Sequence, residues 1–252
     1  MTYNTSSNKL FLIPRAVPQA QFRLFLFPYA GGSASIYMPW LNELASSVEV
    51  VIVQPPGRGS RLAETPYDNM SSLVTKILSF SEFLCEKPSV FFGHSLGSRV
   101  AYETCVQLQN NNLPLPRHLI ASGSKAPHIK SGKRNVHNLP EDEFIDELIK
   151  LKGTPKEILE NQEIISMLIP LLRADFKIAD SYLASGKRLP IPITVLGGED
   201  DVDVKYDQLI AWRELTDDDF AYSVVAGDHF FINTERKVVI KKVNDVVENM
   251  CV

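Results

Sequence analysis

The chain has 252 residues, of which 44% are hydrophobic and 22% are charged, as is usual for a folded globular protein. Its formal net charge is −4, so no overall basic field favours nucleic acid. Residues 1–8 lack the basic-then-apolar order of a signal peptide, and no apolar run reaches the ~20 residues of a membrane-spanning helix. We therefore expect a cytoplasmic protein that binds neither nucleic acid nor membrane.

Short apolar runs rich in Val, Ile and Phe alternate with helical patterns along the chain. Continuous apolar strands are typical of a parallel sheet that is buried on both faces. The predicted strands are Phe22–Phe27, Val48–Val53, Ser89–Phe92, His118–Ser122, Ile193–Leu196 and Ala221–Val225. The alternation predicts an α/β fold with a mainly parallel central sheet flanked by helices.

Apolar residues at helical spacing predict the connecting helices. One pattern extends from Met70 to Glu86, and a second extends from Ser98 to about Leu108. A closing amphipathic helix follows Thr234, whose hydroxyl suits the N-cap position.

A mainly helical stretch separates the last two predicted strands from the others. Its first helix begins after Pro140, with acidic residues in the first turn, and stops at Gly153. Its second helix covers Asn161 to Ala184, and Pro170 should kink or split it.

This insertion belongs above the carboxyl ends of the strands, where ligands bind in α/β sheets. We interpret residues 128–188 as a helical lid on a single domain that covers residues 1–252.

The strongest chemical signal is Gly93-His94-Ser95-Leu96-Gly97, a G-x-S-x-G between a predicted strand and a predicted helix. A tight turn there strains the serine backbone and exposes its hydroxyl, while the glycines allow neighbouring backbone to approach. Ser95 is therefore the candidate nucleophile. The alternative is a glycine-rich turn with an incidental serine.

A serine hydroxyl needs a base, and the order serine, acid, histidine places that base after the last strand. Of the five histidines, His229 occupies that position, whereas His94 lies inside the turn and should point away from Ser95. The acid should follow the preceding strand, within Glu199-Asp200-Asp201. A turn of the form G-x-x-D favours Asp201, with Asp200 as the second choice.

Two backbone N–H groups are expected to stabilise an oxyanion. One belongs to Leu96, directly after the candidate nucleophile, and the other to Ala30 in the glycine-rich loop after the first predicted strand. An ordinary strand-to-helix turn is the alternative interpretation of that loop.

Together these segments resemble a type II thioesterase of polyketide or nonribosomal peptide biosynthesis, over about residues 22–247. Beyond the triad, the similarity rests on the loop 26–35, the P-G-R-x-x-R segment within 54–61, Leu139-Pro140, and the segments 151–155 and 170–176. Three positions depart from the family pattern: Tyr29, Val202 and Asp228. A carboxylate at Asp228 could compete for the hydrogen bond of the base.

The resemblance implies an α/β-hydrolase fold and a serine hydrolase that acts on acyl thioesters. Their carrier would be the phosphopantetheine arm of an acyl or peptidyl carrier protein. That arm belongs to the substrate, so no cofactor and no metal are expected.

The expected substrate- or carrier-binding residues are Tyr29, Lys133, Arg134 and Phe230. Lys133 and Arg134 belong to a basic cluster near the lid entrance that also includes Lys125 and Lys130, and Lys187-Arg188 lie at its exit. Solvated basic surface explains the cluster equally well. A monomer is expected.

Three arginines near the site, Arg58, Arg61 and Arg173, are interpreted as structural ties. Two other functions remain open at this point. A small-molecule carboxylesterase would use the same triad, and a non-catalytic acyl- or carrier-binding protein would keep the fold alone.

Overall fold

The computed structural model describes residues 9–130, 135–151, 153, 158 and 161–250. The strands within them are β1 (Phe11–Leu12), β2 (Phe22–Phe27), β3 (Val48–Val53), β4 (Ser89–His94), β5 (His118–Ser122), β6 (Ile193–Gly198) and β7 (Phe220–Val225). The α-helices are α1 (Met70–Leu78), α2 (Ser81–Cys85), α3 (Leu96–Asn110), α4 (Glu141–Leu151), α6 (Gln162–Ser181), α7 (Tyr206–Ile210), α8 (Phe231–Thr234) and α9 (Arg236–Glu248). Short 3-10 helices are η2 (Ala34–Trp40), η3 (Gly59–Arg61), η4 (Val136–Asn138) and η5 (Ala211–Leu215).

The strands form one sheet in the order β1-β3-β2-β4-β5-β6-β7. Every neighbouring pair is parallel except β1 and β3, which are antiparallel. Each predicted strand is present, and every residue of β2, β3 and β4 is buried, which agrees with their continuous apolar sequences. The edge strand β1 was not predicted, because two residues are too few to show a period.

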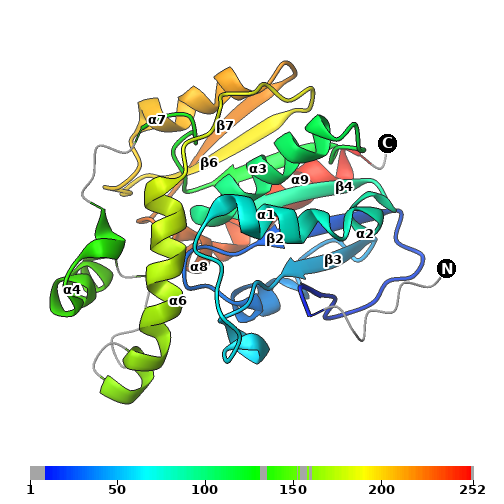
Figure 1. Ribbon diagram of the computed structural model, residues 1–252. Coiled ribbons are helices and arrows are strands. Elements are labelled where there is room, and N and C mark those ends of the chain that lie inside the picture. The colour runs from blue at the N-terminus through cyan, green and yellow to red at the C-terminus, as the bar shows by residue number, and fades with distance from the viewer. Residues whose placement is uncertain (1–8, 131–134, 152, 154–157, 159–160, 251–252) are drawn as a thin grey trace.

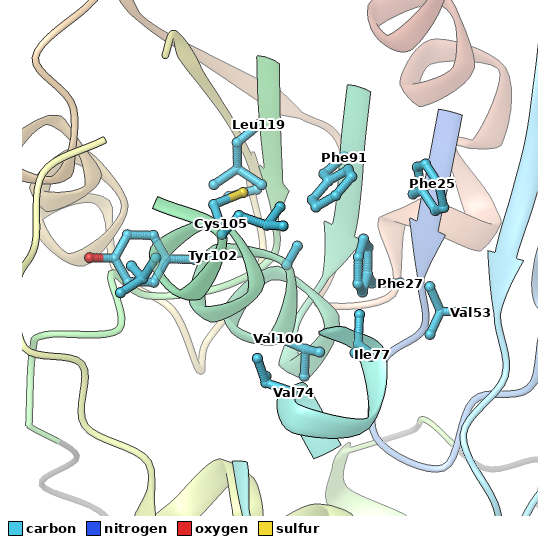
Figure 2. Close-up of a cluster of buried hydrophobic side chains, with 14 of the residues drawn as sticks. Phe25, Phe27, Val53, Val74, Ile77, Phe91, Val100, Tyr102, Cys105 and Leu119 are labelled. Atoms are coloured by element: carbon cyan, nitrogen blue, oxygen red, sulfur yellow. The ribbon is translucent and has the colours of Figure 1, made fainter. Parts of the chain in front are cut away.

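Helices cover both faces of this sheet (Figure 1). On one face, Phe25 and Phe91 of the sheet pack in the same cluster as Ile77 of α1 and Val100 of α3 (Figure 2). On the other face, Trp40 of η2 belongs to a second cluster with residues of α9. Fully burying one such side chain contributes about 1.5–3 kcal/mol to the stability of the fold. The two clusters therefore hold the sheet rigid, and the loops at its edge start from fixed positions.

The predicted insertion lies between β5 and β6 and contains η4, α4 and α6. It forms a third, smaller hydrophobic cluster of its own, in which Phe144 of α4 packs against Phe176 of α6. In Figure 1, α4 and α6 stand beside one end of the sheet rather than against its faces.

Helix α6 continues through Pro170 for 20 residues, so the expectation that this proline could split the helix was wrong. Pro170 is exposed on the outer side of α6, as is Ser166, whose carbonyl loses its helical partner. Water can solvate that carbonyl there, while buried Ile169 and Leu171 anchor the opposite side.

Two helix boundaries also differ from the predictions. The pattern from Met70 to Glu86 is divided into α1 and α2, with a break at Ser79 and Phe80. Thr234 is the last residue of α8 rather than the N-cap of α9, which Glu235 provides without a side-chain hydrogen bond.

In the part of the chain that the structure describes, no helix is long and apolar enough to cross a bilayer.

Candidate active site

The turn between β4 and α3 holds Ser95 in a strained conformation, with φ of 53° and ψ of −116°. Its two glycines are required by close contacts. A Cβ on Gly97 would lie 2.1 Å from the carbonyl oxygen of Phe27, and one on Gly93 would lie 2.3 Å from the backbone of Gly97. The backbone N–H of Ser95 donates to the carbonyl of Ser122 on the neighbouring strand, at 2.8 Å. The turn therefore fixes the Ser95 hydroxyl at the carboxyl edge of the sheet.

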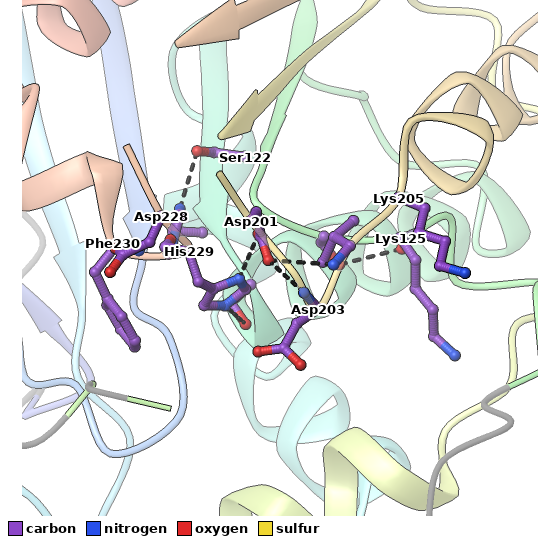
Figure 3. Close-up of polar contacts among 12 residues, drawn as sticks. Ser122, Lys125, Asp201, Asp203, Lys205, Asp228, His229 and Phe230 are labelled. Atoms are coloured by element: carbon purple, nitrogen blue, oxygen red, sulfur yellow. Dashed lines mark hydrogen bonds and ion pairs between the residues drawn. The ribbon is translucent and has the colours of Figure 1, made fainter. Parts of the chain in front are cut away.

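His229 and Asp201 complete a chain of hydrogen bonds from that hydroxyl. His229 Nε2 lies 3.0 Å from Ser95 Oγ, and His229 Nδ1 lies 2.7 Å from Asp201 Oδ2. The loops after β6 and β7 supply the acid and the histidine, and both strands end at the same edge as β4. Figure 3 shows His229 pointing toward Asp201.

The structure distinguishes between the two candidate acids. The second carboxylate oxygen of Asp201 accepts the backbone N–H groups of Asp203 at 2.9 Å and Val204 at 3.2 Å. The Asp201 side chain is only 1% exposed. Asp200 makes no contact with the histidine in the described part of the structure, so Asp201 is the acid that the fold brings to His229.

Asp228 does not take the hydrogen bond of the neighbouring histidine. One of its carboxylate oxygens accepts the backbone N–H of Phe230 at 3.0 Å. The Nδ1 atom of His229 bonds to Asp201 instead. The competition that the sequence suggested is absent from this arrangement.

His94 is hydrogen-bonded to the loop that carries His229, a role that the motif alone did not reveal. Its ring is fully buried, with Nδ1 at 2.9 Å from Ser122 Oγ and Nε2 at 2.9 Å from the carbonyl oxygen of His229. Burial holds the pKa of His94 well below its ordinary value, so the ring is neutral. With Nε2 protonated, it donates to His229, and the ring points away from Ser95 as expected.

The two residues expected to donate to an oxyanion share a pocket with Ser95. Ala30 and Leu96 both line the pocket that contains Ser95 and His229. Neither backbone N–H has a hydrogen-bond partner among the residues that the structure describes. Leu96 is also the first residue of α3, where the helix dipole favours negative charge.

A buried ion pair connects the loop of Ala30 to the insertion. Arg58 donates from both terminal nitrogens to the carboxylate of Asp175 in α6, at 2.9 Å each. The same carboxylate accepts the backbone N–H of Gly31 at 2.7 Å. Gly31 has φ of +76°, so this bond fixes the peptide next to Ala30 in a conformation that favours glycine. Arg58 is thus a structural tie, but sequence spacing gave no sign of its partner.

The other two arginines also make structural ties. Arg61 pairs with Glu64 and donates to the carbonyl of Gln54 at 2.9 Å. Arg173 donates to the carbonyls of His137 and Leu139, each at 2.8 Å. The latter contacts anchor the start of the insertion to α6.

The pocket in front of Ser95 has a volume of about 90 Å³ and mostly apolar walls. The walls come from the first loop, the start of α3, the insertion and the histidine loop, through Tyr29, Ala30, Leu96, Arg99, Leu148, Leu151, Gly153, Leu172, Phe176, Ala179 and Phe230. Tyr29 and Phe230, both expected substrate-binding residues, pack edge to face with their ring centroids 5.2 Å apart. Arg99 was not singled out from the sequence, although its position one helical turn after Ser95 is a usable signal.

Two of the expected carrier-binding residues, Lys133 and Arg134, lie outside the described residues. At the exit of the insertion, Arg188 is bound to Asp217 and to the carbonyl of Thr216. Lys187 donates to the side chain of Asn110. Both exit residues, Lys187 and Arg188, are therefore hydrogen-bonded to residues outside the insertion.

In the described residues, no three His, Cys, Asp or Glu side chains are grouped so that they could hold a metal ion. Cys85 and Cys105 are free thiols, and burial raises the pKa of both. Cys251 lies outside the described residues. A hydroxyl hydrogen-bonded to a histidine that in turn bonds a carboxylate is an arrangement that suits acyl transfer.

Comparison with known proteins identifies the family. Residues 22–247 match the model of the thioesterase domain. The chain is 37% identical to the gramicidin S biosynthesis protein GrsT of Aneurinibacillus migulanus, over 96% of this chain and 94% of that protein. It is 34% identical to the thioesterase PikA5 of Streptomyces venezuelae, over 90% and 82% of the two chains.

Solved structures agree with this result. The type II thioesterase BorB from the borrelidin biosynthetic cluster has a TM-score of 0.86 at 32% identity, covering 96% of this chain and 99% of BorB. YbtT, a type II thioesterase of the yersiniabactin pathway, has a TM-score of 0.82 at 31% identity, covering 93% and 96%. The chain thus belongs to the thioesterase family, as a serine thioester hydrolase with the α/β-hydrolase fold that is similar over nearly its whole length to type II thioesterases.

Proposed function

We propose that the chain hydrolyses acyl thioesters on the phosphopantetheine arm of acyl or peptidyl carrier proteins, as an editing or releasing enzyme of polyketide or nonribosomal peptide synthesis. Ser95 would be the nucleophile, His229 the base and Asp201 the acid that orients it. The continuous hydrogen-bond chain of 3.0 Å and 2.7 Å through these three side chains carries the proposal.

In the first half of the reaction, Ser95 Oγ attacks the thioester carbonyl carbon while His229 Nε2 takes the hydroxyl proton. Asp201 accepts from Nδ1–H and stabilises the resulting imidazolium. The oxyanion of the tetrahedral intermediate lies against the N–H groups of Ala30 and Leu96. Its collapse breaks the carbon–sulfur bond, and the thiol leaves with the proton from His229.

In the second half, water attacks the acyl-Ser95 ester and gives its proton to His229. The second intermediate expels the Ser95 oxygen, which recovers the proton, and the free carboxylic acid departs. Each proton has a protein group to receive it, so the proposed steps use no metal and no cofactor.

Asp175 and Arg58 act in this scheme as positioning residues. The Asp175 carboxylate of this buried pair accepts the backbone N–H of Gly31 at 2.7 Å. This hydrogen bond sets the direction of the adjacent Ala30 peptide. Because Asp175 belongs to the insertion, a lid over the acyl pocket would also help to shape the oxyanion site. This supports assigning residues 128–188 as a lid of the single domain.

Several finer points belong to the same proposal. The named pathways of BorB and YbtT, both type II thioesterases, favour carrier proteins as partners. Tyr29 and Phe230 would contact the acyl group or the arm, since both line the pocket. Lys133 and Arg134 would contact the carrier. The enzyme would work as a monomer in the cytoplasm, without nucleic acid or membrane.

The test is a comparison of three substrates that share one acyl group: an acylated carrier protein, the acyl pantetheine thioester and the p-nitrophenyl ester. Each is given to the native chain and to Ser95→Ala. We expect turnover to be fastest on the carrier and to fall by about 10⁴-fold or more in the variant. Turnover that survives Ser95→Ala would remove Ser95 from the mechanism.

Preference for the oxoester with an untouched carrier thioester would instead make the enzyme an esterase. The docking assignment has its own test, the charge reversal of Lys133 and Arg134. It should raise KM for the acylated carrier and leave the pantetheine thioester unaffected. Equal kinetics on the carrier before and after reversal would end the docking assignment.

A further inference from the structure

The acyl pocket contains an arginine that the proposed reaction does not use. Arg99 lines the pocket together with Leu96, Phe176 and Ala179, beside Ser95. Most of the other walls are apolar, so a cation is an unusual component of this surface. Placing a charge among apolar groups costs free energy unless a partner compensates it.

The protein partners of Arg99 are neutral. Nε donates to the Ser124 hydroxyl at 3.2 Å, and Nη1 donates to the carbonyl of Ala179 at 2.8 Å. These two contacts hold the side chain in place between α3 and α6. Neither supplies a negative charge.

The nearest acids are engaged elsewhere. Glu103, one turn further along α3, accepts from the hydroxyl of Tyr182 and the amide of Gln107. Asp180 is hydrogen-bonded to His137 at 2.7 Å, and its charge acts on Arg99 only through space. Within the described residues, no carboxylate lies within ion-pair distance of Arg99.

The guanidinium of Arg99 also has N–H donors that its two protein hydrogen bonds do not use. It has five N–H groups, and its two hydrogen bonds to Ser124 and Ala179 occupy one on Nε and one on Nη1. In the described residues, the buried side-chain atoms without a partner are Gln109 Oε1 and His128 Nδ1. Nη2 of Arg99 is therefore accessible rather than sealed, and the pocket is the cavity that this side chain lines.

We propose that Arg99 is a specificity residue, and that the pocket accepts the acyl half of a short dicarboxylic acid, whose distal carboxylate pairs with the guanidinium. This rests on the proposed function, because it assigns the substrate class of the same site. An arginine and a carboxylate fit each other in a two-pronged, charge-assisted geometry.

The dimensions favour a short acyl group. Arg99 follows Ser95 by four residues, which is about 6 Å along a helix axis. Arg99 and Ser95 line the same pocket, so a carboxylate only one or two carbons from the thioester carbon would lie on the side of the guanidinium. The same cation would repel the ammonium group of an aminoacyl thioester.

The experiment compares malonyl and isovaleryl pantetheine thioesters, because the malonyl carboxylate replaces the isopropyl group of isovaleryl atom for atom. β-Alanyl pantetheine is the cationic third substrate. We expect the native enzyme to have a kcat/KM for malonyl about 10- to 100-fold above that for isovaleryl, the value of a hydrogen bond to a charged group. The β-alanyl thioester should be the poorest substrate.

Arg99→Met should bring the malonyl-to-isovaleryl ratio to one or below, and Arg99→Lys should restore part of it. Arg117→Met is the matched control, since Arg117 is exposed at the opposite, amino end of β5 and should leave the ratio unchanged. Circular dichroism and thermal unfolding report whether each variant is folded.

Calorimetric binding to Ser95→Ala separates this proposal from the proposed function, because binding needs no turnover. The inactive chain should bind malonyl pantetheine more tightly than isovaleryl pantetheine, and the double variant with Arg99→Met should lose the difference. A native enzyme that hydrolyses both substrates without preferring malonyl overturns the proposal about Arg99. Malonyl preference in binding without Ser95-dependent hydrolysis would overturn the proposed function and leave this proposal standing.

Discussion

The edge of the sheet that carries Ser95 and the helical insertion are built on different physical principles. At the sheet edge, backbone contacts leave no space for change: a single added Cβ at Gly97 would meet the Phe27 carbonyl at 2.1 Å. The insertion instead has a small hydrophobic cluster and polar ties to the sheet, chiefly the pair of Arg58 and Asp175. It also exposes apolar side chains such as Ile149 and Met167.

The difference separates two tasks. A reaction needs nucleophile, base and acid within a few tenths of an ångström of the productive geometry, which rigid packing provides. Substrate choice depends on the pocket walls, several of which come from the insertion. Specificity can therefore change without rebuilding the reaction centre, provided that the ties which shape the oxyanion loop remain.

The largest expected effect concerns the acid at the rigid edge. Asp201→Asn should lower kcat by about 10³- to 10⁴-fold, because the amide cannot hold the required tautomer of His229 or stabilise its cation. Steady-state kinetics with an acyl pantetheine thioester measures this. Asp200→Asn is the matched control and should change kcat by less than about threefold. Equal decreases of kcat in the two variants would mean that the acid cannot be assigned to Asp201 over Asp200.

A smaller effect should separate two buried ion pairs. Asp175→Asn should lower kcat by about 10- to 100-fold with less change in KM, because the Ala30 donor loses its fixed direction. Glu49→Gln breaks the pair with Arg23, which is also buried, with side chains 6% and 7% exposed. Asp175→Asn should lose stability by as much as about 3 kcal/mol, because Arg58 loses its acidic partner. Glu49→Gln should lose less, because Arg23 keeps a second ion pair with Glu86 at 2.8 Å.

Only the first of these variants should lose catalytic rate beyond its loss of folded protein. Thermal unfolding and active-site titration correct for the folded fraction. A kcat decrease of the same size in Glu49→Gln would mean that the pair at Asp175 acts through stability alone.

The same substitution in each region tests how strongly the regions are coupled. Phe91→Leu in β4 should lower the free energy of unfolding of the whole chain by about 1–2 kcal/mol, because Phe91 belongs to the main core. Phe144→Leu removes similar volume from the cluster of the insertion. It should change the global unfolding midpoint less and accelerate proteolytic cleavage within 128–188. Matching midpoints and unchanged proteolysis would show one cooperative unit.

The smallest effect is a pH dependence of the sheet. Burial lowers the pKa of His118 at the amino end of β5 to about 4, from an ordinary value of 6.5. Below pH 6.5 the unfolded chain takes up a proton that the folded chain resists, so stability falls as the pH decreases toward 4. At pH 6 this amounts to less than about 1 kcal/mol, discounted for the partial exposure of the ring.

Chemical denaturation of the native chain and His118→Gln between pH 7 and pH 4 would measure the contribution. The native chain should lose stability more steeply than the variant over this range. Parallel curves would assign the acid sensitivity elsewhere, with the buried and neutral His94 as the next group to test.

Much of the fold, and the meeting of Ser95, His229 and Asp201, could be predicted because the signals are local. Valine-rich runs, a serine between two glycines, and a histidine after the last strand each reflect constraints within a few residues. Where the pattern was short or ambiguous, prediction failed. The two-residue strand β1 was not recognised, and Pro170 was expected to be able to split a helix that it leaves intact.

The sequence by itself determined the elements, their order along the chain and the chemical type of the site. Only the tertiary structure decided that Asp201 rather than Asp200 meets His229, that Asp175 holds both Arg58 and the Gly31 amide, and that Arg99 lines the pocket. The physical reason is that propensity and periodicity act over one turn or one strand. Which side chains meet across 28 residues, as for Asp201 and His229, or across 144, as for Gly31 and Asp175, depends on how all the packed elements fit together.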